Sequence, residues 1–208
     1  MKKGRMTLKD QVYDSIYHDI ISGYYKETDI ITEGDLIRKY EVSKSPVREA
    51  LIALCNENVL RSLPRLGYQL VTVSRKDVLD ILEYRILVES YVLEKAIVNA
   101  KEKDYRYLEE LAEKAKKTTD INESMQFNEE FHLCLCGLAD NEHLTKMLEI
   151  TMKKCNRYSA QHILWSWERG REGMPSYHRE IVLAMEAGDL ELAKKMLLED
   201  LKPLKEDF

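Results

Sequence analysis

The sequence contains little glycine and proline, 8 and 4 residues in a chain of 208, which excludes collagen-like and proline-rich low-complexity chains. No uninterrupted apolar run approaches the ~20 residues that a membrane-spanning helix needs. The first residues, MKKGRMTLKDQ, carry charges with no apolar segment behind them, so we expect no secretory signal. Four cysteines are too few for a disulfide framework in a chain of this length. Together these absences predict a soluble, cytoplasmic protein.

Charge is unevenly distributed along the chain. The formal net charge is −5, but residues 1–75 carry 12 Lys+Arg against 10 Asp+Glu, whereas residues 76–208 carry 20 against 27. Within residues 42–75, five basic residues stand against two acidic ones. A basic stretch inside an acidic protein indicates an anionic partner that binds at one place.

The N-terminal third predicts three helices. Apolar residues recur every four positions from Leu8 to Ile20, which predicts a first helix that ends near Gly23. Thr32 is placed to cap a second helix that reaches about Tyr40. A third helix follows, with Ser45 as its N-cap and Pro46 at its first helical position, or with Ser43 as an equally suitable cap.

Two short strands follow the third helix. Residues 61–63 and 68–73 have strand character, and residues 64–67, Pro-Arg-Leu-Gly, form the loop between them. Three helices followed by a hairpin predict a winged helix-turn-helix domain, which we place at residues 1–74.

From Ser74 onward the pattern is helical. Ser74 and Asp77 have the spacing of a capping box and open a helix that reaches about residue 100. Residues 168–175, ERGREGMP, are the most loop-like stretch. The fold class is therefore mostly α, with an all-helical bundle at residues 75–208. Further helices are expected near 104–117, 123–138, 141–167, 176–187 and 190–205.

The start of the third helix carries the residue types that a DNA-reading helix needs. Such a helix presents short hydrogen-bond donors and a base-reading cation near its N-terminus. Ser43, Lys44, Ser45 and Arg48 supply these groups. Ser45 and Arg48 fall opposite the apolar stripe, which consists of Val47, Ala50, Leu51 and Leu54.

The hairpin tip adds to this pattern. Arg65 is placed to reach the DNA backbone or the minor groove, and Gly67 allows a close approach there. Each residue alone is typical of a solvated face with a basic loop. The ordered set of a capped helix, an outward arginine and a basic hairpin tip favours DNA binding.

This segment resembles the GntR family of bacterial transcription regulators. The resemblance rests on the run VSKSPVREAL at residues 42–51, on Asn58-Val59-Leu60 and on the Pro-Arg-Leu-Gly loop. It implies that the serine, basic and arginine positions at the start of the third helix contact operator DNA.

Two positions depart from the family pattern. Glu27-Thr28 stands where the family usually has Pro-Gly, and Gly34 stands where an arginine is frequent in the second helix. The second departure removes one expected contact to a base or a phosphate.

Polar residues fall on the apolar stripes of the C-terminal helices. Arg85 and Glu89 lie four residues apart on the inward face of the first of them. A buried guanidinium needs a partner, because breaking a buried pair costs about 3–5 kcal/mol. One interpretation is an internal Arg85–Glu89 pair, and the other is that Arg85 also receives an anionic effector.

Four more polar residues point inward from three helices. Asn128 and His132 share one face, His178 lies on the stripe of a second helix, and Asp200 lies on that of a third. Imidazole nitrogens with carboxylate or amide oxygens form a divalent-metal ligand set within a helical bundle.

Residues 75–204 resemble the FadR-type C-terminal effector domain in its metal-binding subgroup, which coordinates a metal with one Asp and three His. His132 and His178 match this pattern, whereas Asn128 stands at the Asp position and Asp200 at the last His position. The resemblance implies a divalent metal (zinc, nickel or manganese), and the loss of an imidazole favours ions that accept oxygen ligands. The alternative is a metal-free pocket in which these side chains hold the effector directly. The resemblance rests on Glu83-x-Arg85, Glu89, Phe131-His132, Leu135, Asn141, Leu144, His178, Ile181, Gly188-Asp189 and Ala193.

The prediction is a homodimeric transcription regulator, a repressor in the commoner family behaviour, whose binding to double-stranded operator DNA responds to a small carboxylate near Arg85. One alternative is a regulator that senses the metal itself. Another is a metal-dependent helical-bundle enzyme. Because the chain has no HExxH motif, no glycine-rich phosphate loop and no nucleophile–base pair, we predict that it is not an enzyme.

Overall fold

The computed structural model describes residues 6–162 and 176–202. The chain divides into two compact units between Val73 and Ser74. The loop predicted at 168–175, and the predicted helix ends at 163–167 and 203–205, lie outside the described residues. No described helix combines the length and the apolar character needed to cross a bilayer.

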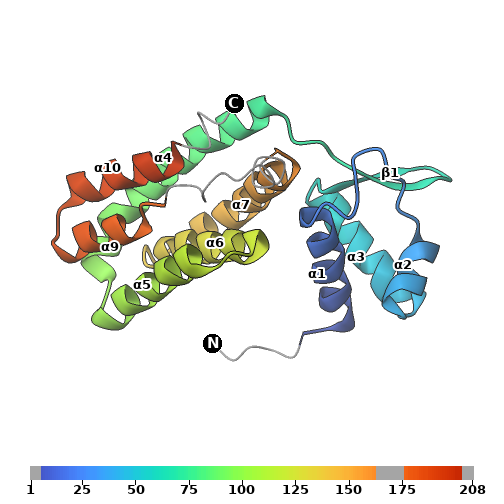
Figure 1. The fold of residues 1–208 in the computed structure, drawn as a ribbon, viewed down its shortest axis with the longest axis horizontal. Helices are drawn as coiled ribbons and strands as arrows, with labels where there is room; N and C mark the ends of the chain where they lie inside the picture. The colour runs from blue at the N-terminus through green and yellow to red at the C-terminus, as the bar shows by residue number, and fades with distance from the viewer. Residues whose placement is uncertain (1–5, 163–175, 203–208) are drawn as a thin grey trace. The chain divides into compact units, whose positions relative to one another are not determined.

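The first unit is a winged helix-turn-helix, as predicted (Figure 1). It consists of α1 (Leu8–Ile21), α2 (Glu33–Tyr40) and α3 (Lys44–Asn56), followed by the antiparallel hairpin of β1 (Leu60–Leu63) and β2 (Gly67–Leu70). Apolar stripes of the three helices meet the hairpin in one core. That core contains Val12, Ile16, Ile20, Ile31, Leu36, Val47, Ala50, Leu51, Leu54, Val59, Leu60 and Leu70.

The first two helices begin at capping threonines. Thr7 Oγ1 accepts a hydrogen bond from the Asp10 N–H at 3.2 Å, and Thr32 Oγ1 accepts one from the Asp35 N–H at 3.2 Å. Each bond satisfies a first-turn N–H that has no acceptor within the helix. The predicted cap at Thr32 is confirmed.

The third helix begins at the earlier of the two predicted caps. Its N-cap is Ser43 and its first residue is Lys44, so Ser45 is not the cap and Pro46 is the third helical residue. Proline is tolerated there because first-turn N–H groups make no intrahelical bond.

The second strand is shorter than predicted. It ends at Leu70 instead of Val73, although the Val71 N–H still donates to the Val59 carbonyl at 3.0 Å. β1 begins at Leu60, one residue earlier than predicted. The two strands pair over four residues each.

Gly67 is required by the architecture of the hairpin. Its φ is +140°, and a Cβ there would lie 2.5 Å from the Ile31 carbonyl oxygen. The approach is close because Ile31 forms an antiparallel bridge with Tyr68. The glycine therefore has a structural reason that is independent of any contact with DNA.

Replacing Gly67 with alanine is expected to lower the free energy of unfolding of the winged unit by about 2 kcal/mol or more, because the backbone conformation is strained and the new methyl group overlaps a carbonyl. Urea denaturation measures this change. Gly137→Ala is the matched control, since nothing lies within 4 Å of a Cβ there, and it is expected to be neutral or slightly stabilising. An unchanged unfolding midpoint for Gly67→Ala would show that the hairpin relaxes at no cost.

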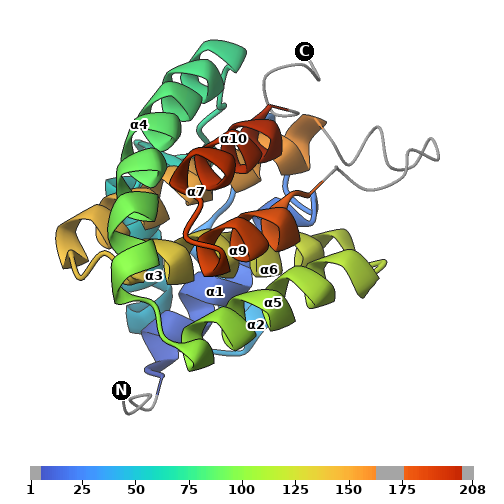
Figure 2. The ribbon, with the colours of Figure 1, turned by 90° about the vertical axis from the view of Figure 1, so that its left-hand side faces the viewer.

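The second unit is a bundle of helices (Figure 2). α4 begins at the predicted capping box, in which Ser74 Oγ accepts from the Asp77 N–H at 3.2 Å and the Ser74 N–H donates to Asp77 at 2.9 Å. α4 packs against α6, α7 and α10, and α5 packs against α6 and α9. The helices are α4 (Arg75–Asn99), α5 (Glu102–Lys117), α6 (Ile121–Gly137), α7 (Glu142–His162), α9 (His178–Glu186) and α10 (Leu190–Leu201).

Candidate nucleic-acid interface and buried histidine cluster

The N-terminal half of α3 presents a polar face to solvent. Ser43, Lys44, Ser45 and Arg48 are all exposed, whereas the residues on the other side of the helix are buried. This confirms that Ser45 and Arg48 fall opposite the apolar stripe. The buried side consists of Pro46, Val47, Ala50, Leu51 and Leu54.

Local contacts hold this face in place. Ser45 Oγ donates to Glu49 Oε1 at 2.8 Å, and Lys44 Nζ lies 3.5 Å from Glu33 Oε2 on α2. The Lys44 side chain is still 67% exposed. Its charge is therefore available to an anion in solution.

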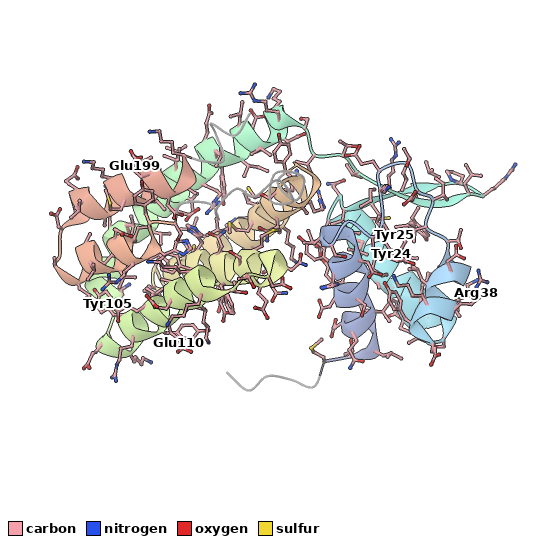
Figure 3. All side chains as sticks on the ribbon, viewed as in Figure 1. Tyr24, Tyr25, Arg38, Tyr105, Glu110 and Glu199 are labelled. Atoms are coloured by element: carbon pink, nitrogen blue, oxygen red, sulfur yellow. The ribbon has the colours of Figure 1, made fainter. Side chains whose placement is uncertain are left out.

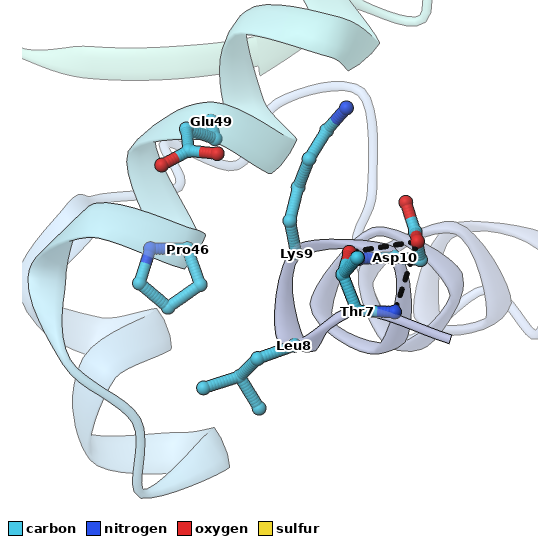
Figure 4. A pocket seen from close by; sticks show the side chains of 6 residues that line it. All are labelled: Thr7, Leu8, Lys9, Asp10, Pro46 and Glu49. Atoms are coloured by element: carbon cyan, nitrogen blue, oxygen red, sulfur yellow. Dashed lines mark hydrogen bonds between the residues drawn. The ribbon is translucent and has the colours of Figure 1, made fainter. Parts of the chain in front are cut away.

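An open groove lies beside α3 (Figure 4). It has a volume of about 400 Å³ and lies between Thr7–Asp10, at the start of α1, and Pro46 and Glu49 of α3. The Lys9 side chain extends along it, so α1 adds a positive charge near the outward face of α3. Charge counting over residues 42–75 misses this lysine because it is distant in sequence.

The hairpin loop places Arg65 in solvent. Arg65 is exposed and has a positive φ of 69°, and Leu66 beside it is 65% exposed. A non-glycine residue with positive φ is uncommon and is typical of a tight turn. The described loop thus carries one cation outward from the hairpin.

The second unit buries the predicted ion pair. Arg85 Nε lies 2.6 Å from Glu89 Oε1, and both side chains are only 1% exposed. Arg85 Nη2 has no hydrogen-bond partner among the described residues. The internal pair is thus present, and it leaves one guanidinium nitrogen available.

Glu89 extends this pair to the histidines, a link that helical spacing did not reveal. Its second oxygen, Oε2, lies 2.6 Å from His132 Nδ1. The carboxylate therefore binds Arg85 with one oxygen and orients the His132 ring with the other. When Nδ1 carries the proton for this bond, Nε2 on the far side of the ring has a free lone pair.

His132, His178 and Asp200 form one cluster. One nitrogen of each histidine and a carboxylate oxygen all lie within 4.8 Å of one another. Asp200 Oδ2 is 3.3 Å from His132 Nε2 and 3.6 Å from His178 Nε2. Neither nitrogen makes a hydrogen bond of normal geometry among the described residues.

Two further contacts position the cluster. The other Asp200 oxygen, Oδ1, accepts the Tyr177 N–H at 2.8 Å, so Asp200 on α10 also fixes the start of α9. Phe131 stacks on the His178 ring with the centroids 3.9 Å apart. Phe131 therefore covers one face of the His178 ring.

Burial and charge determine the protonation of the cluster. Burial by itself raises the pKa of Glu89, but Arg85 and His132 together lower it by more, so the pKa is about 2. Burial likewise raises the pKa of Asp200, but His178 and His132 hold it below its usual range. For His178 burial dominates and lowers the pKa. For His132 burial also lowers the pKa, but the attraction of Glu89, the contact with Asp200 and the hydrogen bond to Glu89 together outweigh it and raise the pKa. Asp200 is thus a carboxylate beside a neutral His178 ring.

The donor set fits a divalent cation. Two buried imidazoles with unsatisfied nitrogens and one ionised carboxylate converge on one point, and these are ligand types that transition metals accept. Asn128 is half-buried and lies one helical turn before His132 on α6, so both residues share a face of the helix. Its amide oxygen remains a predicted fourth ligand.

Two family models match the chain. Residues 8–69 match the model described as bacterial regulatory proteins, gntR family, and residues 80–202 match that of the FCD domain. The matches coincide with the winged unit and the helical unit.

Curated relatives are similar to this chain over different lengths. The HTH-type transcriptional regulator YdhC of Bacillus subtilis is 32% identical over 67% of this chain and 64% of the relative. The gluconate operon transcriptional repressor of Bacillus subtilis is 28% identical over 60% and 52%. The HTH-type transcriptional regulator McbR of Escherichia coli is 26% identical over 96% and 90%. The alignments with the two Bacillus proteins thus span between about a half and two thirds of those proteins.

Solved structures share the fold. Escherichia coli McbR/YncC superimposes with a TM-score of 0.77 at 22% identity and covers 95% of both chains. A GntR transcriptional regulator from Rhodococcus has a TM-score of 0.74 at 20% identity, over 93% of both chains. At these identities the likeness is one of fold alone.

Proposed function

Because this chain belongs to the GntR family of bacterial regulatory proteins and carries an FCD domain, we propose that it is a homodimeric repressor whose operator binding responds to a small carboxylate and a divalent metal in its helical unit. Transcription regulation itself follows from the family, whose matched domains and relatives are regulators and not enzymes. The named repressor among the relatives supports the sign of regulation.

The exposed start of α3 supports the DNA contact. Ser43, Lys44 and Ser45 lie at a helix N-terminus, where backbone N–H groups favour a phosphate. Arg48 follows one turn later as the base-reading cation, and Arg65 approaches the neighbouring backbone. In a dimer, two such helices contact the half-sites of a symmetric operator.

The convergence of His132, His178 and Asp200 is the single observation that carries the metal proposal. These residues would hold zinc, nickel or manganese, with Asn128 as a weak fourth ligand. Glu89 orients His132 from behind, as carboxylates commonly do for metal-binding histidines. A bound divalent ion supplies a centre to which a carboxylate ligand can coordinate.

Arg85 supports the choice of an anionic effector. Its Nη2 has no partner among the described residues, although the side chain is 1% exposed. A carboxylate that bonds to this nitrogen satisfies a buried donor. An effector of this kind changes operator affinity only if it binds one arrangement of the dimer better than the other.

Titrating divalent ions into the metal-stripped protein, with and without small carboxylates such as citrate, tests the proposal through operator affinity. We expect the metal alone to change affinity little and the carboxylate with metal to weaken binding. A full response to the metal alone identifies a metal sensor instead. A carboxylate response without metal identifies the metal-free pocket.

Replacing His132 with alanine is expected to abolish stoichiometric metal binding, because it removes one of two imidazoles and leaves too few strong ligands. Elemental analysis of the purified variant measures this loss. His143→Ala, which alters an exposed histidine on α7, is the control and keeps the wild-type metal content. Full metal retention in the His132 variant would place the site elsewhere.

A further inference from the structure

Gly34 lies in the first turn of α2, and the backbone there does not require glycine. Its φ lies outside the left-handed region. A Cβ added to it would meet Arg38 Nη1 at 3.7 Å and Thr32 Oγ1 at 3.9 Å, both ordinary contacts. The space above Gly34 is thus bordered by the guanidinium of Arg38.

The position of Arg38 follows from helix geometry and two polar contacts. Long side chains on a helix lie over the preceding turn, which brings the guanidinium of Arg38 back to Gly34. Arg38 Nη2 lies 2.5 Å from Asp35 Oδ1, and Asp35 Oδ2 accepts a hydrogen bond from Thr32 Oγ1 at 2.6 Å. The capping threonine thereby helps to orient the arginine.

Stability does not explain this arrangement. The Arg38 side chain is 75% exposed, and Asp35 is 55% exposed, so the pair is a surface ion pair that contributes little. Figure 3 shows Arg38 on the outer side of α2. Because a guanidinium has five N–H donors, the bond to Asp35 leaves donors for another anion.

The first turns of α2 and α3 are joined. Glu33, the first residue of α2, lies 3.5 Å from the Nζ of Lys44, the first residue of α3. Gly34 therefore follows directly the residue through which α2 contacts the first residue of α3. In helix-turn-helix proteins the helix before the recognition helix crosses the DNA backbone.

We propose that Arg38 binds a backbone phosphate of the duplex, with its guanidinium placed over Gly34 in the first turn of α2. The proposal rests on the proposed DNA-binding function and extends the interface to α2. Arginine suits this role because its planar fork can bind two phosphate oxygens. A phosphate contact strengthens binding to any sequence and adds to its salt dependence.

The test measures fluorescence anisotropy over a series of KCl concentrations with two labelled duplexes. One is a duplex that the wild-type protein selects from a random pool, and the other is its scrambled counterpart. We expect Arg38→Ala to weaken binding to both duplexes by about tenfold, and to reduce the slope of log affinity against log salt by about one per winged unit. Arg106→Ala is the matched control, because Arg106 is an exposed arginine on α5 that also pairs within its own helix.

Moving the charge provides a second measurement. In the double variant Gly34→Arg/Arg38→Ala the guanidinium starts from the position over which Arg38 now lies. We expect this variant to recover most of the lost affinity and salt slope. A double variant as weak as Arg38→Ala would overturn the assignment of the charge to this position.

The outcomes separate this inference from the proposed function. If Arg48→Ala loses specific binding while Arg38→Ala keeps wild-type affinity and salt slope, the phosphate contact is wrong and the DNA interface stands. If Arg38→Ala weakens only the selected duplex, Arg38 reads bases and the phosphate assignment is wrong. If neither variant changes binding, the assignment of the α3 face fails as well.

Discussion

Arg48→Ala is expected to abolish specific operator binding while leaving the proposed dimer intact. Arg48 is the exposed cation opposite the buried stripe of α3, and an arginine that binds a base edge contributes about 1–3 kcal/mol of discrimination. Two copies in a homodimer double this effect, so affinity for the operator falls by about 30-fold or more. Anisotropy titrations at fixed salt measure the loss.

Two comparisons make the Arg48 result interpretable. Binding of a scrambled duplex is expected to weaken far less, because that binding depends on phosphate contacts and not on base edges. Size-exclusion chromatography is expected to show the wild-type oligomer, since Arg48 projects from the folded unit into solvent. Unchanged operator affinity at the same salt would remove the role assigned to Arg48.

Glu89→Ala is expected to destabilise the helical unit by about 3–5 kcal/mol, because it leaves the guanidinium of Arg85 buried without its partner. Arg85 is 1% exposed and bonds to Glu89 at 2.6 Å, and His132 loses the same carboxylate. Urea denaturation followed by far-UV circular dichroism measures the shift in the midpoint.

Two further variants identify the cause of this loss. Glu94→Ala is the matched control on the same helix: Glu94 pairs with Lys194 at 2.7 Å but is 45% exposed, so we expect little change in the unfolding midpoint. The double variant Arg85→Met/Glu89→Leu is expected to recover much of the lost stability, because it removes both charges together. Wild-type stability in Glu89→Ala would mean that water or another group satisfies Arg85.

Much of the fold could be predicted from local patterns. Thr32 and Ser74 cap helices where predicted, and Gly188 and Asp189 separate α9 from α10. These features depend on residues three or four apart, which the backbone brings together in any helix. Local sequence does not choose between Ser43 and Ser45 as the cap of α3, and in the structure Ser43 is the N-cap without a side-chain capping hydrogen bond.

Helical periodicity predicts which polar residues are buried but not which of them contact one another. Periodicity correctly placed Arg85, Glu89, His132 and His178 on inward faces. It did not predict that Glu89 bonds to His132, because α4 and α6 are 43 residues apart at that contact. It also offered no signal that Arg38 lies over Gly34, since the rotamer of an exposed side chain depends on Asp35 and Thr32.

Local sequence patterns were enough to predict the helices, the caps at Thr32 and Ser74, the winged motif and the inward positions of Arg85, Glu89, His132 and His178, because all of these depend on near neighbours along one chain. Packing between elements brings the ligand atoms of His132, His178 and Asp200, from three helices, within 4.8 Å of one another, and it places a carbonyl beside Gly67 that leaves no room for a side chain. Such distances depend on how helices and strands pack, which side-chain shape and burial determine across the whole unit.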